Sequence, residues 1–178
     1  ASMSGVDGAG VIDVEAREGV LAAEDVVLGW NELFNELLVA DETNQNPGYA
    51  SRSMAMMNLA IYDAVTLASG DPENTCYDYG GAAMGSLRGV SAEVAASQAA
   101  YTVLSSLYPD QSALIDAYLD GFMANRPGNA ATEASVALGT ESGATILAIR
   151  ADDGSDATVD YVYGDDAGDF QADPLNPD

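Results

Sequence analysis

Apolar residues recur at intervals of three and four along most of this chain, the spacing that places side chains on one face of an α-helix. The first run begins at about Glu24. Its apolar face consists of Val26, Trp30, Leu33 and Leu37. A second run extends from about Tyr49 to Ala68. Between the two, polar residues precede Pro47 and Gly48, so the pattern predicts two helices joined by a Pro-Gly turn.

Three more helices follow, each preceded by a residue whose side chain can cap a helix N-terminus. These N-cap residues are Ser91, Asp110 and Asn129, and their helices extend to about residues 107, 126 and 150. The last helix is rich in Ala, Gly, Thr and Ser, so we expect it to depend on packing neighbours for its stability. The short connections predict that neighbouring helices are mostly antiparallel.

The remaining segments lack this period and divide the chain into three parts. Residues 1–23 form a Gly-rich, acidic arm, residues 24–150 the helical bundle, and residues 151–178 an acidic, irregular tail or linker. Within the bundle, residues 73–89 predict an ordered loop with one short helical turn. We expect the tail to dock if Tyr161, Tyr163 and Phe170 contact the helices, and to fray otherwise. The sequence therefore predicts an all-α bundle of about five helices with irregular acidic ends.

The two first helices are expected to form the centre of the bundle. The residues predicted to be buried there are Trp30, Leu33, Met54, Met57, Ile61 and Val65. Arg52 and Asp63 lie eleven residues apart, about three helical turns, on the same side of the second helix. Because a partly buried charge needs a partner, this placement predicts a structural ion pair with another helix.

The charge balance excludes several classes of partner. The chain has 29 acidic residues, 5 basic residues that are all Arg, and no His, for a formal net charge of −24 at pH 7. Such a chain cannot neutralise the many phosphates of a nucleic acid or an anionic membrane, which argues against both as partners. We expect the acidity to maintain solubility in a saline or extracellular setting, as in halophilic proteins. No stretch reaches the roughly 18 apolar residues of a membrane span, so no membrane insertion is predicted.

The residue types in this chain include few of the side chains that commonly act in catalysis. Without His or Lys the chain has no Ser or Cys triad, no Schiff-base lysine and no P-loop lysine. Glu32 and Glu36 share a helical face, where like charges usually only line a solvated surface. Cys76 has no histidine to activate it, and residues 54–57 contain three Met that are expected to fill the core. We therefore predict no catalytic, cofactor-binding or metal-binding residue in this chain.

The acidic tail is the one segment that invites a calcium site, because Ca²⁺ binds carboxylate and carbonyl oxygens. An EF-type loop beginning at Asp152 would place Gly154 and Asp156 at its third and fifth positions. However, Ala157 then stands where the turn glycine is needed, and Tyr163 stands where a bidentate Glu is needed. A solvated acidic tail is the expected structure.

Four segments resemble one known family. Residues 50–65, ASRSMAMMNLAIYDAV, resemble the opening helical segment of bacterial vanadium-dependent haloperoxidase-like proteins, which belong with the type 2 phosphatidic acid phosphatases. Trp30-Asn31 after an acidic lead is similar to the start of that segment. Residues 95–107, followed by Tyr108-Pro109 and a helix to Arg126, are similar to the next pair of helices. The junction IRADDG at residues 149–154 is similar to the exit from the family's amino-terminal bundle. The resemblance covers about residues 26–170, and Asn58 stands where the family often has a structural histidine.

The resemblance implies a helical half without a catalytic half. Family members hold vanadate or phosphate with a downstream set that includes Lys, several Arg and two His, and none of these residues can be assigned here. Vanadate is therefore implied only for a downstream half, and a full-length parent would be haloperoxidase-like or acid phosphatase-like. The expected function is a non-catalytic helical domain that packs against or dimerises a catalytic domain. The alternative is a stand-alone structural or assembly subunit.

Three explanations stay open at this point. The chain is a fragment of a longer protein, a natural stand-alone helical module, or a subunit that assembles with itself or with another chain. Residues 171–178, QADPLNPD, resemble the linker into the family's second half, which slightly favours the first explanation.

Overall fold

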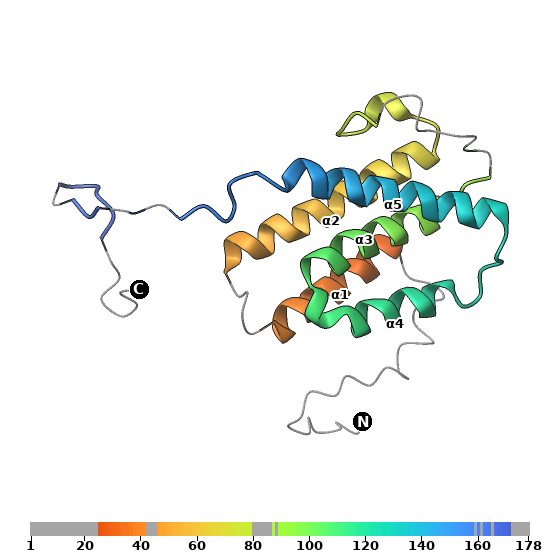
Figure 1. Ribbon diagram of the computed structural model, residues 1–178, viewed down its shortest axis with the longest axis horizontal. Coiled ribbons are helices and arrows are strands. Elements are labelled where there is room, and N and C mark those ends of the chain that lie inside the picture. The colour runs from red at the N-terminus through yellow and green to blue at the C-terminus, as the bar shows by residue number, and fades with distance from the viewer. Residues whose placement is uncertain are drawn as a thin grey trace, which may run out of the picture.

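The computed structural model describes residues 25–41, 46–79, 87, 89–158, 160, 162–164 and 166–171. These ranges contain five α-helices and two short 3-10 helices, and no β-strand (Figure 1). The α-helices are α1 (Val26–Ala40), α2 (Pro47–Ala68), α3 (Ala92–Leu107), α4 (Ser112–Met123) and α5 (Ala130–Arg150), and the 3-10 helices are η2 (Pro72–Asn74) and η3 (Pro109–Gln111). The predicted all-α bundle is confirmed. Within the described ranges, no helix combines the length and apolar character needed to cross a bilayer.

Capping side chains define where four of the helices begin. The side chains of Asp25, Asn46, Ser91 and Asn129 each accept a hydrogen bond from a backbone N–H in the first turn of the helix that follows. Pro47 is the first residue of α2, where its missing N–H leaves no hydrogen bond unmade. The prediction of a Pro-Gly turn at this point is therefore wrong, because Asn46 caps the helix one residue earlier.

The start of α4 also differs from the prediction. Asp110 lies inside η3 and caps nothing, and α4 begins at Ser112 with no side-chain cap. The proline at position 109 favours a tight 3-10 turn at the corner between α3 and α4, and this turn takes the place of the expected cap. The helix ends at Met123 and not at Arg126.

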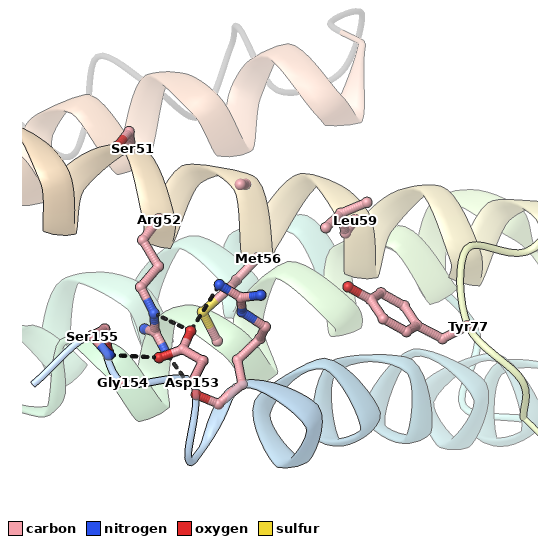
Figure 2. Close-up of a pocket in the computed structure, with 10 residues that line it drawn as sticks. Ser51, Arg52, Met56, Leu59, Tyr77, Asp153, Gly154 and Ser155 are labelled. Carbon is pink, nitrogen blue, oxygen red and sulfur yellow. Dashed lines mark hydrogen bonds and ion pairs between the residues drawn. The ribbon is translucent and has the colours of Figure 1, made fainter. Parts of the chain in front are cut away.

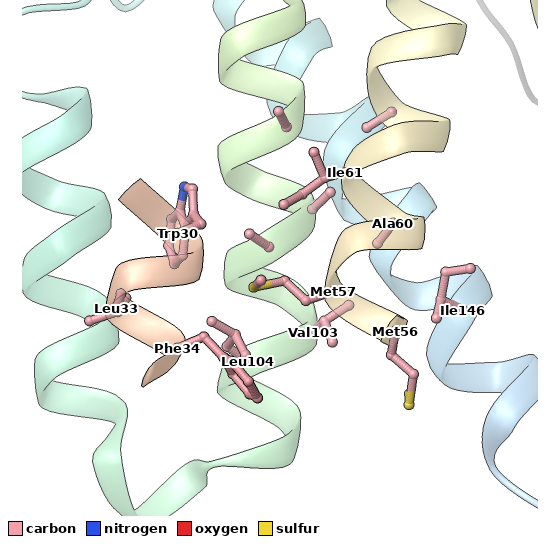
Figure 3. Packing of buried hydrophobic residues seen from close by; sticks show 14 of the residues in the cluster. Trp30, Leu33, Phe34, Met56, Met57, Ala60, Ile61, Val103, Leu104 and Ile146 are labelled. Atoms are coloured by element: carbon pink, nitrogen blue, oxygen red, sulfur yellow. The ribbon is translucent and has the colours of Figure 1, made fainter. Parts of the chain in front are cut away.

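The centre of the bundle is α3. It packs most extensively against α5 and α2, and it also contacts α1 and α4, whereas α1 and α2 contact each other much less. The prediction that the first two helices form the centre is wrong, because α3 buries residues around more of its circumference: Val94, Ala95, Ala96, Ser97, Ala99, Ala100, Val103 and Leu104. Figure 3 shows Trp30 and Phe34 on one side of α3, with Met56, Ala60 and Ile146 on the other.

Small residues let α3 and α5 approach closely. A Cβ atom added to Gly139 would lie 2.7 Å from Gln98 Cβ and 2.9 Å from Ala99 N, and it would also meet the carbonyl oxygen of Ala95. A Cβ on Gly143 would lie 2.7 Å from Thr102 Cβ. The small-residue composition that weakens α5 as an isolated helix is therefore what allows its backbone to contact α3.

Two of the residues predicted to be buried are not. Trp30, Leu33, Met57 and Ile61 are buried, as expected. Met54 is 37% exposed and Val65 is only partly buried. Met56 is 3% exposed and takes the core position instead. The face of α2 that packs inward is thus rotated from the face inferred from Met54 and Val65, because α2 has to cover both α3 and α5.

The acidic segment after α5 is irregular and extends away from the helices (Figure 1). Tyr163 and Phe170 stack on each other with ring centroids 6.2 Å apart, and they stay 51% and 65% exposed. Neither ring is buried against the bundle. Tyr161, the whole predicted arm (residues 1–23) and residues 172–178 lie outside the described ranges.

Candidate functional site

A cleft of about 440 Å³ lies between the N-terminal half of α2 and the turn that follows α5. Arg52, Met56 and Leu59 of α2 line one side, and Arg150, Asp153 and Ser155 line the other. Tyr77, from the loop after η2, closes the far end. Figure 2 shows the charged groups gathered at one end and Leu59 and Tyr77 at the other, with the Tyr77 hydroxyl directed toward the charged end.

One carboxylate joins two arginines at the charged end. Asp153 Oδ2 lies 2.9 Å from Arg52 Nε and 2.8 Å from Arg150 Nη2. Arg52 Nη2 also donates a hydrogen bond of 2.7 Å to the carbonyl oxygen of Arg150. The expected pairing of Arg52 with a partner from another element is found, although the carboxylate comes from the turn after α5 and not from a helix.

The two arginines keep Asp153 ionised. The Arg52 hydrogen bond is the main cause that lowers the pKa of Asp153 well below its usual range, and a hydrogen bond with Ser155 and the charge of Arg150 add to it. The Asp153 side chain is only 9% exposed, whereas that of Arg150 is 42% exposed. Asp153 is thus a fixed anion that positions two guanidinium groups, one of them open to solvent.

Asp63 occupies a different environment from the one predicted. It is fully buried, and it accepts hydrogen bonds from the Cys76 backbone N–H at 2.7 Å and from the Tyr79 hydroxyl at 2.8 Å. The predicted ion pair with another helix is therefore wrong for this residue. Asp63 instead holds the loop after η2 against α2, and so places Tyr77 at the end of the cleft.

Tyr79 extends this contact to α5. Its hydroxyl lies 3.2 Å from Ser142 Oγ, which itself donates a hydrogen bond of 2.8 Å to the carbonyl oxygen of Ala60. Burial is the main cause that raises the pKa of Tyr79 above its usual range, and the neighbouring Asp63 raises it further. Tyr79 therefore stays protonated and donates to Asp63, which links the loop, α2 and α5.

Cys76 lies on the exposed surface of this loop. Partial removal of the thiol from water, followed by the charge of Asp63 and a hydrogen bond to it, raises the pKa of Cys76. A raised pKa disfavours the thiolate, which is the nucleophilic form. The geometry agrees with the predicted loop cysteine and gives no support to a catalytic thiol.

The other residues considered from the sequence lie away from the cleft or serve the core. Glu32 is exposed on α1, which contributes nothing to the cleft lining, and Glu36 is partly buried on the same helix. Met56 and Met57 belong to the hydrophobic core. In the described part of the chain, no group of three or more His, Cys, Asp or Glu side chains is arranged to hold a metal ion.

The comparisons with known proteins do not identify the role of this cleft. A scan against protein-family models, a search of curated proteins and a search of solved structures each found no match for the chain. The interpretation of the cleft therefore depends on its own contacts. Arg52 was predicted from the sequence, but Arg150, Asp153 and Tyr77 were not. Arg150 and Asp153 lie about 100 positions from Arg52 and meet it only where α2 and α5 pack together. Tyr77 reaches the cleft through the loop that Asp63 holds against α2.

Proposed function

We propose that this chain is a non-catalytic helical domain of a vanadium haloperoxidase-like protein, which packs against or dimerises a catalytic domain. In this role the bundle supplies a rigid surface on which the catalytic domain packs. The vanadate or phosphate chemistry belongs to residues that this chain does not contain. The absence of His and Lys from the sequence supports this division, since the family's downstream site depends on both.

One contact carries the proposal. Two of the segments that resemble the family, residues 50–65 and 149–154, are far apart in the sequence, yet they meet through Arg52, Asp153 and Arg150. This contact supports the proposal because it joins two segments of the resemblance within one packed bundle.

The buried polar groups support a scaffold as well. Trp30 Nε1 donates to Ser97 Oγ at 3.0 Å, and the Ser91 backbone N–H donates to Ser135 Oγ at 2.8 Å. Asp63 is occupied by the loop contacts described above. Each of these groups joins one element to another, which is what buried polar groups do when they stabilise a fold.

An activity assay tests the proposal directly. The purified 178-residue chain, incubated with vanadate, bromide, hydrogen peroxide and an organic acceptor that is readily brominated, is expected to give no brominated product. With a phosphate monoester it is expected to release no phosphate. Turnover in either assay, abolished by substitution of a residue in this chain, would contradict the proposal.

A mass measurement separates this function from the alternative of a stand-alone assembly subunit. Large apolar side chains, including Leu28 at 62% and Val39 at 82%, are exposed and could form contacts between copies. If the native protein has a mass well above 18.3 kDa, the helical-domain proposal is favoured. A native mass near that of this chain, with self-association in sedimentation experiments, would favour the assembly subunit instead.

A further inference from the structure

We propose that the cleft between α2 and the turn after α5 binds a small organic anion whose carboxylate or phosphate head contacts Arg150 and Arg52. The apolar body of the ligand would lie on Ala55, Met56 and Leu59, toward Tyr77. This site is separate from any vanadate chemistry and does not depend on the proposed function.

The number of hydrogen-bond donors in the cleft exceeds what Asp153 can accept. Two guanidinium groups carry about ten N–H donors, whereas one carboxylate offers about four lone-pair sites. Asp153 Oδ2 accepts from Arg52 Nε and Arg150 Nη2, and Asp153 Oδ1 accepts from the Ser155 backbone N–H at 3.0 Å. Arg52 Nη2 also donates to the carbonyl oxygen of Arg150, which leaves the other N–H groups of the two guanidiniums for a second acceptor. A second anion can therefore bind without displacing Asp153.

The local charge of the cleft is opposite to that of the chain. Two arginines and one aspartate give a local excess of one positive charge, although the chain as a whole carries −24. Asp152 and Asp156 flank the turn in sequence but do not line the cleft. Two of the five basic residues of the chain thus share one concave surface, where a guanidinium can hold a carboxylate or phosphate in a planar, bidentate arrangement.

The shape of the cleft selects the kind of anion. A volume of about 440 Å³ lies within the range of small-molecule sites. The charged end and the end formed by Leu59 and Tyr77 are separated along the cleft (Figure 2). A ligand with an anionic head and an apolar body would contact both ends, whereas an inorganic anion would use only the charged end.

The test is a titration of the full chain, followed by the amide signals of Tyr77, Gly154 and Ser155 in NMR spectra. Benzoate and phenyl phosphate are the anionic ligands, and benzyl alcohol is the uncharged control. We expect at least one of the two anions to shift these signals saturably, with a Kd on the order of 1 mM, and benzyl alcohol to leave them unchanged. The relative affinities show whether carboxylate or phosphate is preferred.

Variants locate the site. Arg150→Gln removes the exposed guanidinium but keeps the Arg52–Asp153 pair, and it is expected to weaken binding about tenfold or more. Arg126→Gln makes the same change of charge at a surface pair with Glu93 outside the cleft, and it is expected to leave the affinity within about twofold. Ala55→Trp fills the cleft without changing the charge and is expected to abolish binding.

Two results would overturn the inference. The first is the absence of a saturable shift for both anions in a chain whose fold is intact by circular dichroism. The second is an equal loss of affinity in Arg126→Gln, which would indicate binding to net charge alone.

Discussion

The two sides of α3 are built from residues of very different size. Toward α1 and α4, the elements that pack on α3 carry large rings that also contact each other. Trp30 of α1 meets Tyr118 of α4 edge-on with centroids 4.7 Å apart, and Phe34 of α1 meets Tyr108, the residue after α3, at 6.0 Å. Toward α5, the contacts are made by Gly139 and Gly143, which allow the two backbones to touch. The first side depends on the volume of a few side chains, and the second depends on the absence of side chains.

This difference predicts how each side responds to substitution. A core of large side chains loses stability when volume is removed, because a cavity forms and the neighbours relax only in part. A contact between backbones loses stability when volume is added, because main-chain atoms cannot move aside as a flexible side chain can. The candidate cleft lies between α2 and the turn after α5. Its shape therefore depends on the packing of α5 through Gly139 and Gly143, where added side-chain volume is expected to be poorly tolerated.

The largest effect is expected on the aromatic side. Trp30→Ala removes a fully buried ring and its hydrogen bond to Ser97, and it should lower the free energy of unfolding by about 4 kcal/mol. Trp30→Phe keeps an aromatic ring, so we expect roughly half that loss. Chemical denaturation of the three proteins measures the difference. Equal losses in Trp30→Ala and Trp30→Phe would show that the hydrogen bond, and not the volume, is decisive.

On the small-residue side, one methyl group should suffice. Gly139→Ala is expected to lower the free energy of unfolding by about 2 kcal/mol, even though alanine has the higher helix propensity. Gly128→Ala is the control, because no atom lies within 4 Å of a Cβ atom added there. It should change stability by less than about 0.5 kcal/mol. If both variants unfold at the same denaturant concentration, the close approach of α3 and α5 is not what stabilises this side.

A further comparison concerns two tyrosine–aspartate hydrogen bonds, one to a buried carboxylate and one on the exposed surface. Tyr79→Phe removes the donor to the buried Asp63 and should lower the free energy of unfolding by about 1–2 kcal/mol. Tyr101→Phe removes a similar hydrogen bond to Asp116, 2.9 Å long but exposed, and should have an effect of less than about 0.5 kcal/mol. Thermal unfolding monitored by circular dichroism compares the two. A larger loss in Tyr101→Phe would contradict the role assigned to Asp63.

The smallest effect concerns Asp153 and depends on pH. Because its pKa is lower in the folded chain than in the unfolded one, its stabilising contribution is complete at pH values above the unfolded value of about 4 and is lost as the pH falls toward the folded value. Asp153→Asn should therefore melt at a lower temperature than the unsubstituted chain at pH 7, and the difference should shrink below pH ~4.

The surface pair of Glu93 and Arg126 provides the control for this pH dependence. Its atoms are 3.3 Å apart and Glu93 is 69% exposed, so Glu93→Gln should change the melting temperature little at any pH. A difference between Asp153→Asn and the unsubstituted chain that stays constant from pH 7 to pH 3 would mean that the carboxylate charge of Asp153 contributes nothing.

Helix formation was predictable because it depends on residues that are close in the sequence. Asn129 caps α5 through hydrogen bonds to N–H groups two and three residues away, and Ser91 caps α3 in the same way. The wrong predictions also concern neighbouring residues. Asp110 is a residue type that commonly caps helices, but Pro109 favours a 3-10 turn that begins before Asp110 can act as an N-cap. Pro47 resembled a turn residue, yet its fixed backbone angle also suits the first turn of a helix.

The candidate site was predictable only in part. A charge at Arg52 among apolar residues indicated a partner, and the reasoning was correct for Arg52 because burial of an unpaired charge is unfavourable. The same reasoning failed for Asp63, since neutral donors from Tyr79 and the Cys76 backbone satisfy it. No periodicity relates Arg52 to Arg150 or Asp153, so the cleft itself could not be inferred.

The sequence alone determined the helical class, most helix boundaries and the strongly acidic character of this chain, because these properties depend on composition, apolar period and neighbouring residues. Only the tertiary structure decided that α3 is central, that Gly139 touches the α3 backbone, and that Arg52 and Arg150 share Asp153. The physical reason is that helix periodicity specifies which residues share a face, whereas the rotation and separation of packed helices depend on all the side chains between them.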